Sequence, residues 1–355
     1  MKKIVVFGAT GNIGAYFTDY CRKHVDTGYE VIAVGRRKTD FFASVGVTYL
    51  SVDITREEDF ELLPKDGVYA VVNLAGILPA YYKDFNPLMY IQTNVSGAIR
   101  ILEYAGVVGA DRVVYTQTWA ELAGYWGESE VLSSEMPRKL VYSGDHAFYA
   151  ITKSMVVDTM EFYKQEFGLK NFVFRLPNVY LYHPQKKYYV EGVEKAIGYR
   201  LMIDKAMKGE PIEIWGNPDA FKDILYIKDL CQMIVKSLFV DRDGGTYNAG
   251  TGIKTTLREQ IEGIVQVFSS NPSKHIITEK PSGSTFTSFV MDISKLKLEL
   301  GYEPEYTYIK YLEDYKKELV EKRFSKLWGE QSLESREGIH ENICSNTNVW
   351  LSCSC

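Results

Sequence analysis

A tyrosine and a lysine stand four positions apart in the stretch Tyr149-Ala150-Ile151-Thr152-Lys153. On an α-helix this spacing places both side chains on the same face. A phenol has an unperturbed pKa near ~10, so a tyrosine that acts as a base at neutral pH needs a shift of roughly 3 units, or about 4 kcal/mol. A neighbouring ammonium can supply much of that stabilisation. The pattern predicts a proton-transfer pair, although an amphipathic helix with a solvated lysine has the same spacing.

A glycine-rich segment follows the apolar run Ile4 to Phe7 and precedes a helical pattern. Glycines at such a strand-to-helix turn permit a tight turn, close approach of a pyrophosphate and close packing of the helix, whose N-terminus then faces the anion. A plain turn is the alternative reading. We expect a dinucleotide site that involves Gly8, Thr10, Gly11, Asn12, Ile13 and Gly14.

The end of the second predicted strand, Glu30 to Val34, bears on the type of dinucleotide. An acidic residue at this place hydrogen-bonds the ribose 2′-hydroxyl and repels a 2′-phosphate. The chain instead carries Gly35 followed by Arg36 and Arg37, and guanidinium groups favour a phosphate. NADP is therefore expected, with NAD as the alternative, unless both arginines are merely solvated. Further contacts are expected after the third and fourth strands, from Asp53, Ile54, Leu74, Ala75 and Gly76.

Strands and helices alternate over the first 180 residues. Helical patterns such as Tyr90 to Val107 and Ala147 to Phe167 separate most of the strands. The alternation predicts an α/β fold, a Rossmann-type doubly wound parallel sheet with helices on both faces. The strand patterns cover Ile4 to Phe7, Glu30 to Val34, Val47 to Val52, Tyr69 to Leu74, Arg112 to Thr116 and Asn171 to Arg175.

The pattern changes after residue 180. We expect a smaller mixed α/β substrate-binding lobe at residues 181–323, with some exchange of chain between the lobes. Polar, irregular sequence at residues 324–355 predicts a loose tail. Helical patterns in the second lobe cover Val190 to Lys208, Lys228 to Phe239, Thr256 to Phe268 and Tyr308 to Lys322, and Pro211 to Trp215 reads as a strand.

Composition excludes several classes of protein. The net charge is -5 and no basic run occurs, so no nucleic acid is expected as a partner. No apolar stretch is long enough to span a bilayer, and the run after Met1 is too short for a signal-peptide core, so we expect no membrane and a cytoplasmic location. The 5 cysteines show no Cys-x-x-Cys spacing, which argues against disulfides and zinc.

Seven motifs in one order resemble the extended short-chain dehydrogenases/reductases, and among them the nucleotide-sugar epimerase/dehydratase group. The resemblance extends over about residues 1–318. Its motifs are the glycine loop from Gly8, Asn73 to Gly76, Thr118, Tyr149 to Lys153, Arg175 to Tyr180, Lys222 to Asp229, and Tyr247 to Gly252.

The resemblance implies roles for several side chains. Tyr149 would be the general acid/base, and Lys153 would hold the nicotinamide ribose and lower the pKa of the tyrosine. Thr118 would hydrogen-bond the reacting oxygen, which adds a second donor to the phenol. Asn94 resembles a family asparagine near the cofactor, with a helix-surface amide as the alternative. Asn178 matches a substrate-contacting asparagine of the family.

Departures from the family pattern narrow the reaction. Dehydratases of the family carry an Asp-Glu pair directly after the catalytic Ser/Thr, where this chain has Trp119-Ala120, so dehydration is disfavoured. Glu121 is displaced along the turn and is expected to be structural or solvated. The segment Gly124 to Asp145, with Trp126 and Tyr142, and the following His146 are expected to border the sugar pocket.

The resemblance also bears on the nucleotide and on assembly. Lys222, and near Pro281 also Lys280, stand where the family has arginines that grip the diphosphate. A lysine neutralises phosphate as a point charge but lacks the bidentate fork. A homodimer is implied through Tyr90 to Val107 and Ala147 to Phe167, although an intramolecular core explains the apolar residues of these helices equally well.

Three functions follow from these observations. The first is an NAD(P)-dependent epimerase of a nucleoside-diphosphate sugar that acts by transient hydride transfer at C4. The second is an NADPH-dependent ketoreductase of a keto-sugar nucleotide or a related carbonyl, which Gly35-Arg36-Arg37 favours. The third is a cofactor-sensing protein without turnover, which would have little need of Tyr149 and Lys153.

Overall fold

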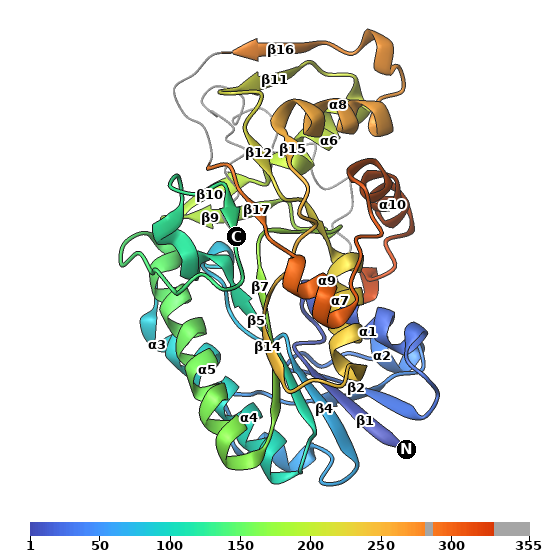
Figure 1. Cartoon of the computed structure of the whole chain (residues 1–355). Coiled ribbons are helices and arrows are strands. Elements are labelled where there is room, and N and C mark those ends of the chain that lie inside the picture. Colours follow the sequence, from blue (N-terminus) through green and yellow to red (C-terminus); the bar gives the residue numbers. More distant parts are fainter. Residues whose placement is uncertain (281–286, 330–355) are drawn as a thin grey trace.

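The six strands expected before residue 180 lie in one parallel sheet of the computed structural model, which describes residues 1–280 and 287–329 (Figure 1). The strand order is β14-β7-β5-β4-β1-β2-β3, and every neighbouring pair is parallel. The predicted fold class is thereby confirmed. The strands are β1 (Lys2–Phe7), β2 (Tyr29–Gly35), β3 (Thr48–Ser51), β4 (Val68–Asn73), β5 (Arg112–Thr118), β7 (Lys170–Leu176) and β14 (Gly244–Asn248).

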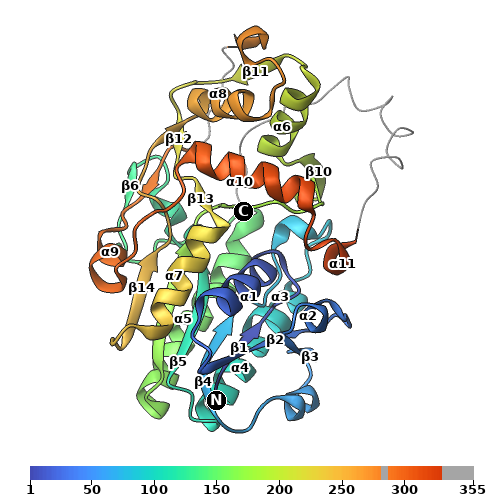
Figure 2. The same cartoon turned by 90° about the vertical axis from the view of Figure 1, so that its right-hand side faces the viewer.

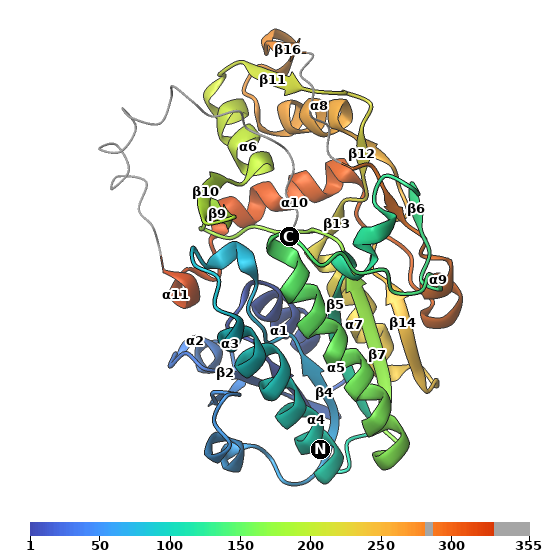
Figure 3. The same cartoon turned by 90° about the vertical axis from the view of Figure 1, so that its left-hand side faces the viewer.

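Both faces of the sheet are buried because successive apolar side chains of its strands point to opposite sides. Ile4 and Val6 of β1 belong to a core that continues into the second lobe, and Val5 and Phe7 belong to a separate core on the other face. Helices α1 (Asn12–His24) and α7 (Ile227–Phe239) cover the first face (Figure 2). Helices α4 (Ala98–Val107) and α5 (Asp145–Phe167) cover the second (Figure 3).

The predicted helix Tyr90 to Val107 consists of three consecutive pieces. Helix α3 (Pro87–Tyr90) leads into a π-helical segment, Ile91–Gly97, which continues as α4. Shorter elements of this half are α2 (Phe41–Ser44), the 3-10 helices η1 (Glu58–Leu62), η2 (Pro79–Tyr81) and η4 (Trp119–Tyr125), and β6 (Val131–Leu132).

The chain returns to the parallel sheet after the predicted boundary at residue 180. Strand β14 pairs with β7, with Gly244 beside Asn171 and Asn248 beside Arg175. A strand from beyond residue 180 thus completes the parallel sheet of the first half. Three two-stranded pairs also join distant segments: β13 (Leu225–Tyr226) with β8 (Val179–Tyr180), β17 (Val290–Met291) with β6, and β12 (Phe221–Lys222) with β15 (Thr255–Thr256).

The second lobe differs from expectation at its start. Val190 to Lys208 was predicted as one helix, but α6 begins only at Gly198 (Gly198–Lys208). The residues before it form an antiparallel hairpin of β9 (Lys187–Val190) and β10 (Val193–Ala196). Its turn contains Glu191 and Gly192 with φ values of 49° and 74°, which end any helical run.

Among the remaining elements of the second lobe, the helices at 227–239, 257–268 and 308–321 and the strand at 212–215 match the predictions, and the other elements were not predicted. Helix α10 packs against α8 and runs below α6 and α8 in Figure 2. These elements are β11 (Ile212–Trp215), parallel to β16 (Ile277–Lys280), α8 (Leu257–Phe268), the 3-10 helix η5 (Pro272–Lys274), α9 (Ser294–Leu300) and α10 (Tyr308–Glu321).

The expected tail begins with an ordered segment. Helix α11 (Ser325–Trp328) follows Phe324, and both Phe324 and Leu327 are buried. Phe324 packs edge-on against Tyr16 of α1, with ring centroids 4.8 Å apart. The polar composition of the predicted tail obscured the closely spaced large side chains of Phe324, Leu327 and Trp328, of which Phe324 and Trp328 contact Tyr16 of the first helix. Residues 330–355 lie outside the described part of the chain.

Among the described residues, none of the helices combines the length and the apolar content that a bilayer crossing requires. Cys21 and Cys231 are both buried and free.

Candidate active site

A cavity of about 320 Å³ opens at the carboxyl ends of the parallel strands. Its wall includes Gly11 to Gly14 after β1, Leu74 to Gly76 after β4, Thr118 at the end of β5 and Leu176 to Asn178 after β7. Ligands of open α/β sheets bind at this edge because the loops there alternate between the two faces. The cavity therefore collects most of the residues that the sequence singled out.

The glycine loop is too tightly packed to accept side chains at two positions. Gly8 has a φ of 80°, and a Cβ there would lie 2.6 Å from the Ala75 nitrogen. A Cβ on Gly14 would lie 2.1 Å from the Gly8 carbonyl oxygen. Helix α1 starts at the cavity, and no side chain caps its first turn. Its open N–H groups and the bare loop fit a pyrophosphate.

Three predicted catalytic side chains line the same cavity: Thr118, Tyr149 and Lys153. Thr118 ends β5 and caps η4, because its Oγ1 accepts a hydrogen bond of 3.2 Å from the Ala120 N–H. Tyr149 and Lys153 lie one turn apart near the start of α5. The strand end and the helix thus present two hydroxyls and an amine to one space.

Burial lowers the pKa of Lys153 from 10.5 to about 7. Its Nζ lies 3.9 Å from the centroid of the Tyr115 ring, a cation–π contact. Within residues 1–280 and 287–329, no hydrogen bond or ion pair joins this Nζ to a protein acceptor. An ammonium group has three N–H donors, so the cavity side of protonated Lys153 fits the hydroxyls of a bound ribose.

Three predicted cofactor contacts, Asp53, Ile54 and Asn94, are not among the lining residues of the cavity. Asp53 Oδ1 accepts hydrogen bonds from the Thr55 N–H and hydroxyl, at 3.0 and 2.8 Å. The neighbouring Ile54 packs against Gly97, where a Cβ would meet it at 2.7 Å. Asn94 is buried and bonds both the N–H and the carbonyl of Ile77, at 2.8 and 3.0 Å. Its amide therefore holds the loop that follows Gly76.

The two arginines after β2 differ in their surroundings. Arg37 donates a hydrogen bond to the Leu327 carbonyl of α11. Arg36 is exposed, and its side chain makes no hydrogen bond to another described residue. Helix α11 also reaches the glycine loop, because Trp328 Nε1 donates to the Thr10 carbonyl at 3.2 Å. The end of the described chain thus borders the expected 2′-phosphate region.

Aromatic side chains form one wall of the cavity. Trp119 stacks on Trp126 and on Phe289, with ring centroids 4.2 and 4.1 Å apart. Trp126 and His146 line the cavity, as expected for the segment around Gly124 to Asp145. Tyr142 does not, since it is 80% exposed.

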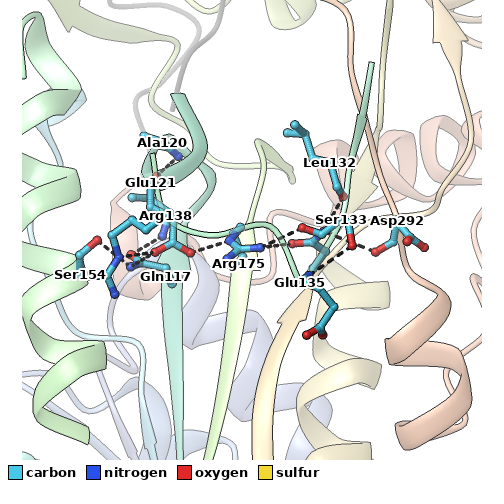
Figure 4. Close-up of polar contacts among 12 residues, drawn as sticks. Gln117, Ala120, Glu121, Leu132, Ser133, Glu135, Arg138, Ser154, Arg175 and Asp292 are labelled. Atoms are coloured by element: carbon cyan, nitrogen blue, oxygen red, sulfur yellow. Dashed lines mark hydrogen bonds and ion pairs between the residues drawn. The ribbon is translucent and has the colours of Figure 1, made fainter. Parts of the chain in front are cut away.

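Glu121 is buried and ion-paired. Only 3% of its surface is exposed, and its Oε1 lies 2.5 Å from Arg175 Nε (Figure 4). Gln117 and Arg138 donate to its Oε2, at 2.9 and 3.4 Å. The solvated alternative for Glu121 was therefore wrong and the structural one holds.

Of the two predicted substrate-binding residues, only one lines the cavity. Asn178 lines the cavity. Lys222 is buried on β12 and is not one of the lining residues. Lys280 pairs with Glu213 at 2.6 Å on the outer strands.

Two cationic lining residues, Lys187 and Arg200, carried no motif in the sequence. Lys187 pairs with Glu194 across the hairpin at 2.6 Å. Arg200 is buried and donates to the carbonyls of Leu181, His183 and Gln185, which shapes the loop after β8. Only the predicted helix around Arg200 hinted at its position, since nothing nearby in sequence marks its partners.

A family model described as the NAD dependent epimerase/dehydratase family matches residues 4–250. A putative UDP-glucose 4-epimerase of Methanocaldococcus jannaschii is 23% identical over 309 residues, which are 85% of this chain and 93% of that protein. A dTDP-glucose 4,6-dehydratase of Xanthomonas campestris is 27% identical over 259 residues, 67% of this chain and 69% of that protein.

Among solved structures, the UDP-glucose 4-epimerase of Thermotoga maritima with UDP-glucose superimposes with a TM-score of 0.70. The sequence identity is 22%, and the match covers 90% of this chain and 100% of that one. This similarity shows the same fold.

Proposed function

The chain belongs to the NAD-dependent epimerase/dehydratase family, and on that premise we propose that it epimerises a nucleoside-diphosphate sugar at C4 by transient hydride transfer. The observation that carries the proposal is the single cavity that contains Thr118, Tyr149 and Lys153 beside the glycine loop. Trp119 and Ala120 stand where a dehydratase needs carboxylates, so elimination of water lacks its acid and base.

The residues present fit a nicotinamide dinucleotide. Gly11 to Gly14 would hold the pyrophosphate, Leu74 to Gly76 would border the rings, and Lys153 would bind ribose hydroxyls. A dinucleotide held by these residues would supply reversible hydride transfer to and from the sugar carbon. We propose NADP, because Arg36 replaces the acid that would repel a 2′-phosphate and its side chain is exposed for such a contact. NAD remains the alternative.

Proton transfer would belong to Tyr149 and Thr118. The Tyr149 oxygen takes the proton of the C4 hydroxyl and later gives it back to the ketone oxygen. The Thr118 Oγ1 already accepts from the Ala120 N–H, so its own proton remains to be donated to the same sugar oxygen. Protonated Lys153 stabilises the phenolate in the low-dielectric cavity. Asn178, which lines the cavity, would hold the sugar, whereas Lys222 is buried outside the lining and is not proposed as a phosphate ligand.

A keto-sugar reductase is the second candidate, and the missing acid after β2 favours it. The two functions differ in cofactor exchange, because an epimerase recycles its dinucleotide whereas a reductase must release it every turnover. We expect denaturation of the purified protein to release dinucleotide. Empty sites together with consumption of NADPH by keto-sugar nucleotides would instead indicate the reductase.

The proposed function is tested on a panel of sugar nucleotides with Tyr149→Phe. We expect the wild type to interconvert one C4 pair and the variant to lose about 1000-fold or more in kcat. Tyr142→Phe is the matched control, because Tyr142 lies exposed outside the cavity. If no pair is converted, or Tyr149→Phe keeps its activity, the proposal is wrong.

A homodimer through α5 and the segment before α4 is also proposed. Met155 and Phe162, about two turns apart on α5, expose 50% and 58% of their surface, and Leu88 and Ile91 are exposed beside this helix. Large apolar side chains clustered on one face mark association surfaces. The cytoplasm stays the expected compartment.

A further inference from the structure

Glu121 is a buried charge for which the proposed chemistry has no direct use. Its carboxylate receives donors from Gln117, Arg138 and Arg175 (Figure 4). An isolated carboxylate in such a place would be costly, and only complete pairing makes it tolerable. Its donors come from separate segments, so the carboxylate joins parts of the chain that are distant in sequence.

The Glu121 carboxylate fixes the orientation of the Gln117 amide. A carboxylate only accepts, so the amide nitrogen of Gln117 must face it, at 2.9 Å. The same nitrogen donates to Ser154 Oγ at 3.2 Å. The amide oxygen therefore points the other way and accepts the Thr118 N–H at 2.7 Å. Glu121 thus selects the end of the amide that meets the backbone of Thr118.

This arrangement holds Thr118 relative to the helix of the proton-transfer pair. Ser154 directly follows Lys153 on α5, so the Gln117 amide links the end of β5 to that helix. Gln117, Ser154 and Glu121 are all buried, and water does not compete for these bonds.

The other oxygen of the Glu121 carboxylate accepts from Arg175 on β7, the strand that leads to Asn178. Arg175 lies near the end of β7, three residues before Asn178, and its Nη1 donates to Asn248 Oδ1 at 2.8 Å. Asn248 in turn donates to the Leu132 carbonyl at 2.6 Å. Glu121 therefore sits between the strand end that carries Thr118 and the strand end that leads to Asn178.

We propose that Glu121 is a positioning residue: through Gln117 it fixes Thr118 against the helix that bears Tyr149 and Lys153. The catalytic part of this inference rests on the proposed function. A glutamine at position 121 keeps the shape but has one acceptor oxygen, so it cannot serve both Gln117 and Arg175 as the carboxylate does. If the glutamine oxygen stays with Arg175, its amide nitrogen faces Gln117, whose oxygen must turn toward it and no longer accepts the Thr118 N–H.

The first measurement separates rate from binding. For Glu121→Gln we expect kcat to fall about tenfold or more, while KM for the sugar nucleotide and Kd for the dinucleotide stay within about twofold. Glu318→Gln is the matched control, since Glu318 is also 3% exposed and pairs with Arg323 at 2.7 Å. It should lose stability but keep its kcat.

A double-mutant cycle tests whether Glu121 acts through Thr118. Thr118→Val alone should lower kcat about 100-fold, as expected for removal of one donor at a reacting oxygen. In the Glu121→Gln background the same change should cost at least about tenfold less, because the hydroxyl is already misplaced. Effects that simply multiply would overturn the proposal.

Amide hydrogen exchange gives a readout that needs no substrate. The peptide 117–122 should exchange about tenfold faster in Glu121→Gln and remain protected in Glu318→Gln. Unchanged exchange overturns the positioning role. Faster exchange in a protein that converts no sugar nucleotide leaves that role standing and rejects the epimerase instead. Should Glu121→Gln not fold, Gln117→Met removes the same link while Glu121 keeps Arg175, with the same expected results.

Discussion

Replacement of Lys153 by methionine should stabilise the dinucleotide-free protein at neutral pH. Burial lowers the pKa of Lys153 from 10.5 to about 7, so folding must remove a favourably solvated charge. Each pKa unit corresponds to about 1.36 kcal/mol, which gives a cost of about 4 kcal/mol at pH 7. The cation–π contact of Lys153 with the Tyr115 ring offsets roughly 1 to 2 kcal/mol of this cost. We expect a net gain of about 2 to 3 kcal/mol for Lys153→Met.

The pH dependence has a definite sign. Above pH 7 the unfolded chain binds the proton that folded Lys153 has lost, so wild-type stability rises with pH through the window from about 7 to 10.5. The cost is fully present below that window and is gone above it. The advantage of Lys153→Met should therefore shrink by about 2 kcal/mol between pH 7 and pH 9.

Urea unfolding of both proteins at pH 6, 7, 8 and 9, without dinucleotide, measures this difference. Lys170→Met is the control, because Lys170 pairs with Asp111 at 3.0 Å and is part-exposed. Its difference from the wild type should not follow the same pH course. A less stable Lys153→Met at pH 7, or an advantage that is constant with pH, would refute the reasoning.

Three further predictions concern the glycine loop, the cofactor and assembly. Gly14→Ala should weaken dinucleotide binding, measured by calorimetry, about 100-fold or more, because its Cβ would lie 2.1 Å from the Gly8 carbonyl oxygen. Gly46→Ala is the control: its Cβ meets no neighbour, but the φ of 74° strains an alanine, so this variant should lose stability and keep its affinity. Arg36→Ala should reduce the preference for NADPH over NADH about tenfold in binding curves, and an unchanged preference contradicts the proposed NADP site. Arg37→Ala should instead lower the Tm, because the hydrogen bond to the Leu327 carbonyl is lost. Phe162→Glu should convert the proposed dimer to a monomer in light scattering with the fold retained, and Glu166→Lys, an exposed charge change on the same helix, serves as its comparison; a wild-type monomer would remove the dimer altogether.

The first half of the fold could be predicted because its signals are local. The run Ile4 to Phe7 is apolar on both faces, and the glycines after it permit only a tight turn toward the helix. The spacing of Tyr149 and Lys153 requires only a helix to bring them to one cavity. Thr118 and Asn178 could be assigned because they belong to motifs that occur in the same order as in the family.

The second half depends on contacts that the sequence does not display. Strand β14 begins with two glycines and is short, so only its partner β7 marks it as a strand. The hairpin before Gly198 was hidden because Val190 to Lys208 also has a helical spacing of apolar residues. The docking of Phe324 depends on Tyr16, which is more than 300 residues away in the chain.

The position of β14 has a consequence for biosynthesis. Strand β7 is complete at Leu176, but its neighbour does not leave the ribosome until roughly 70 residues later. At about 5 to 20 residues per second, the unpaired edge of β7 waits for several seconds. Such an edge is a template for pairing with other chains until it is covered. A nascent chain that stalls before Gly244 is therefore prone to aggregation, and residues 1–180 alone lack the edge strand that covers β7.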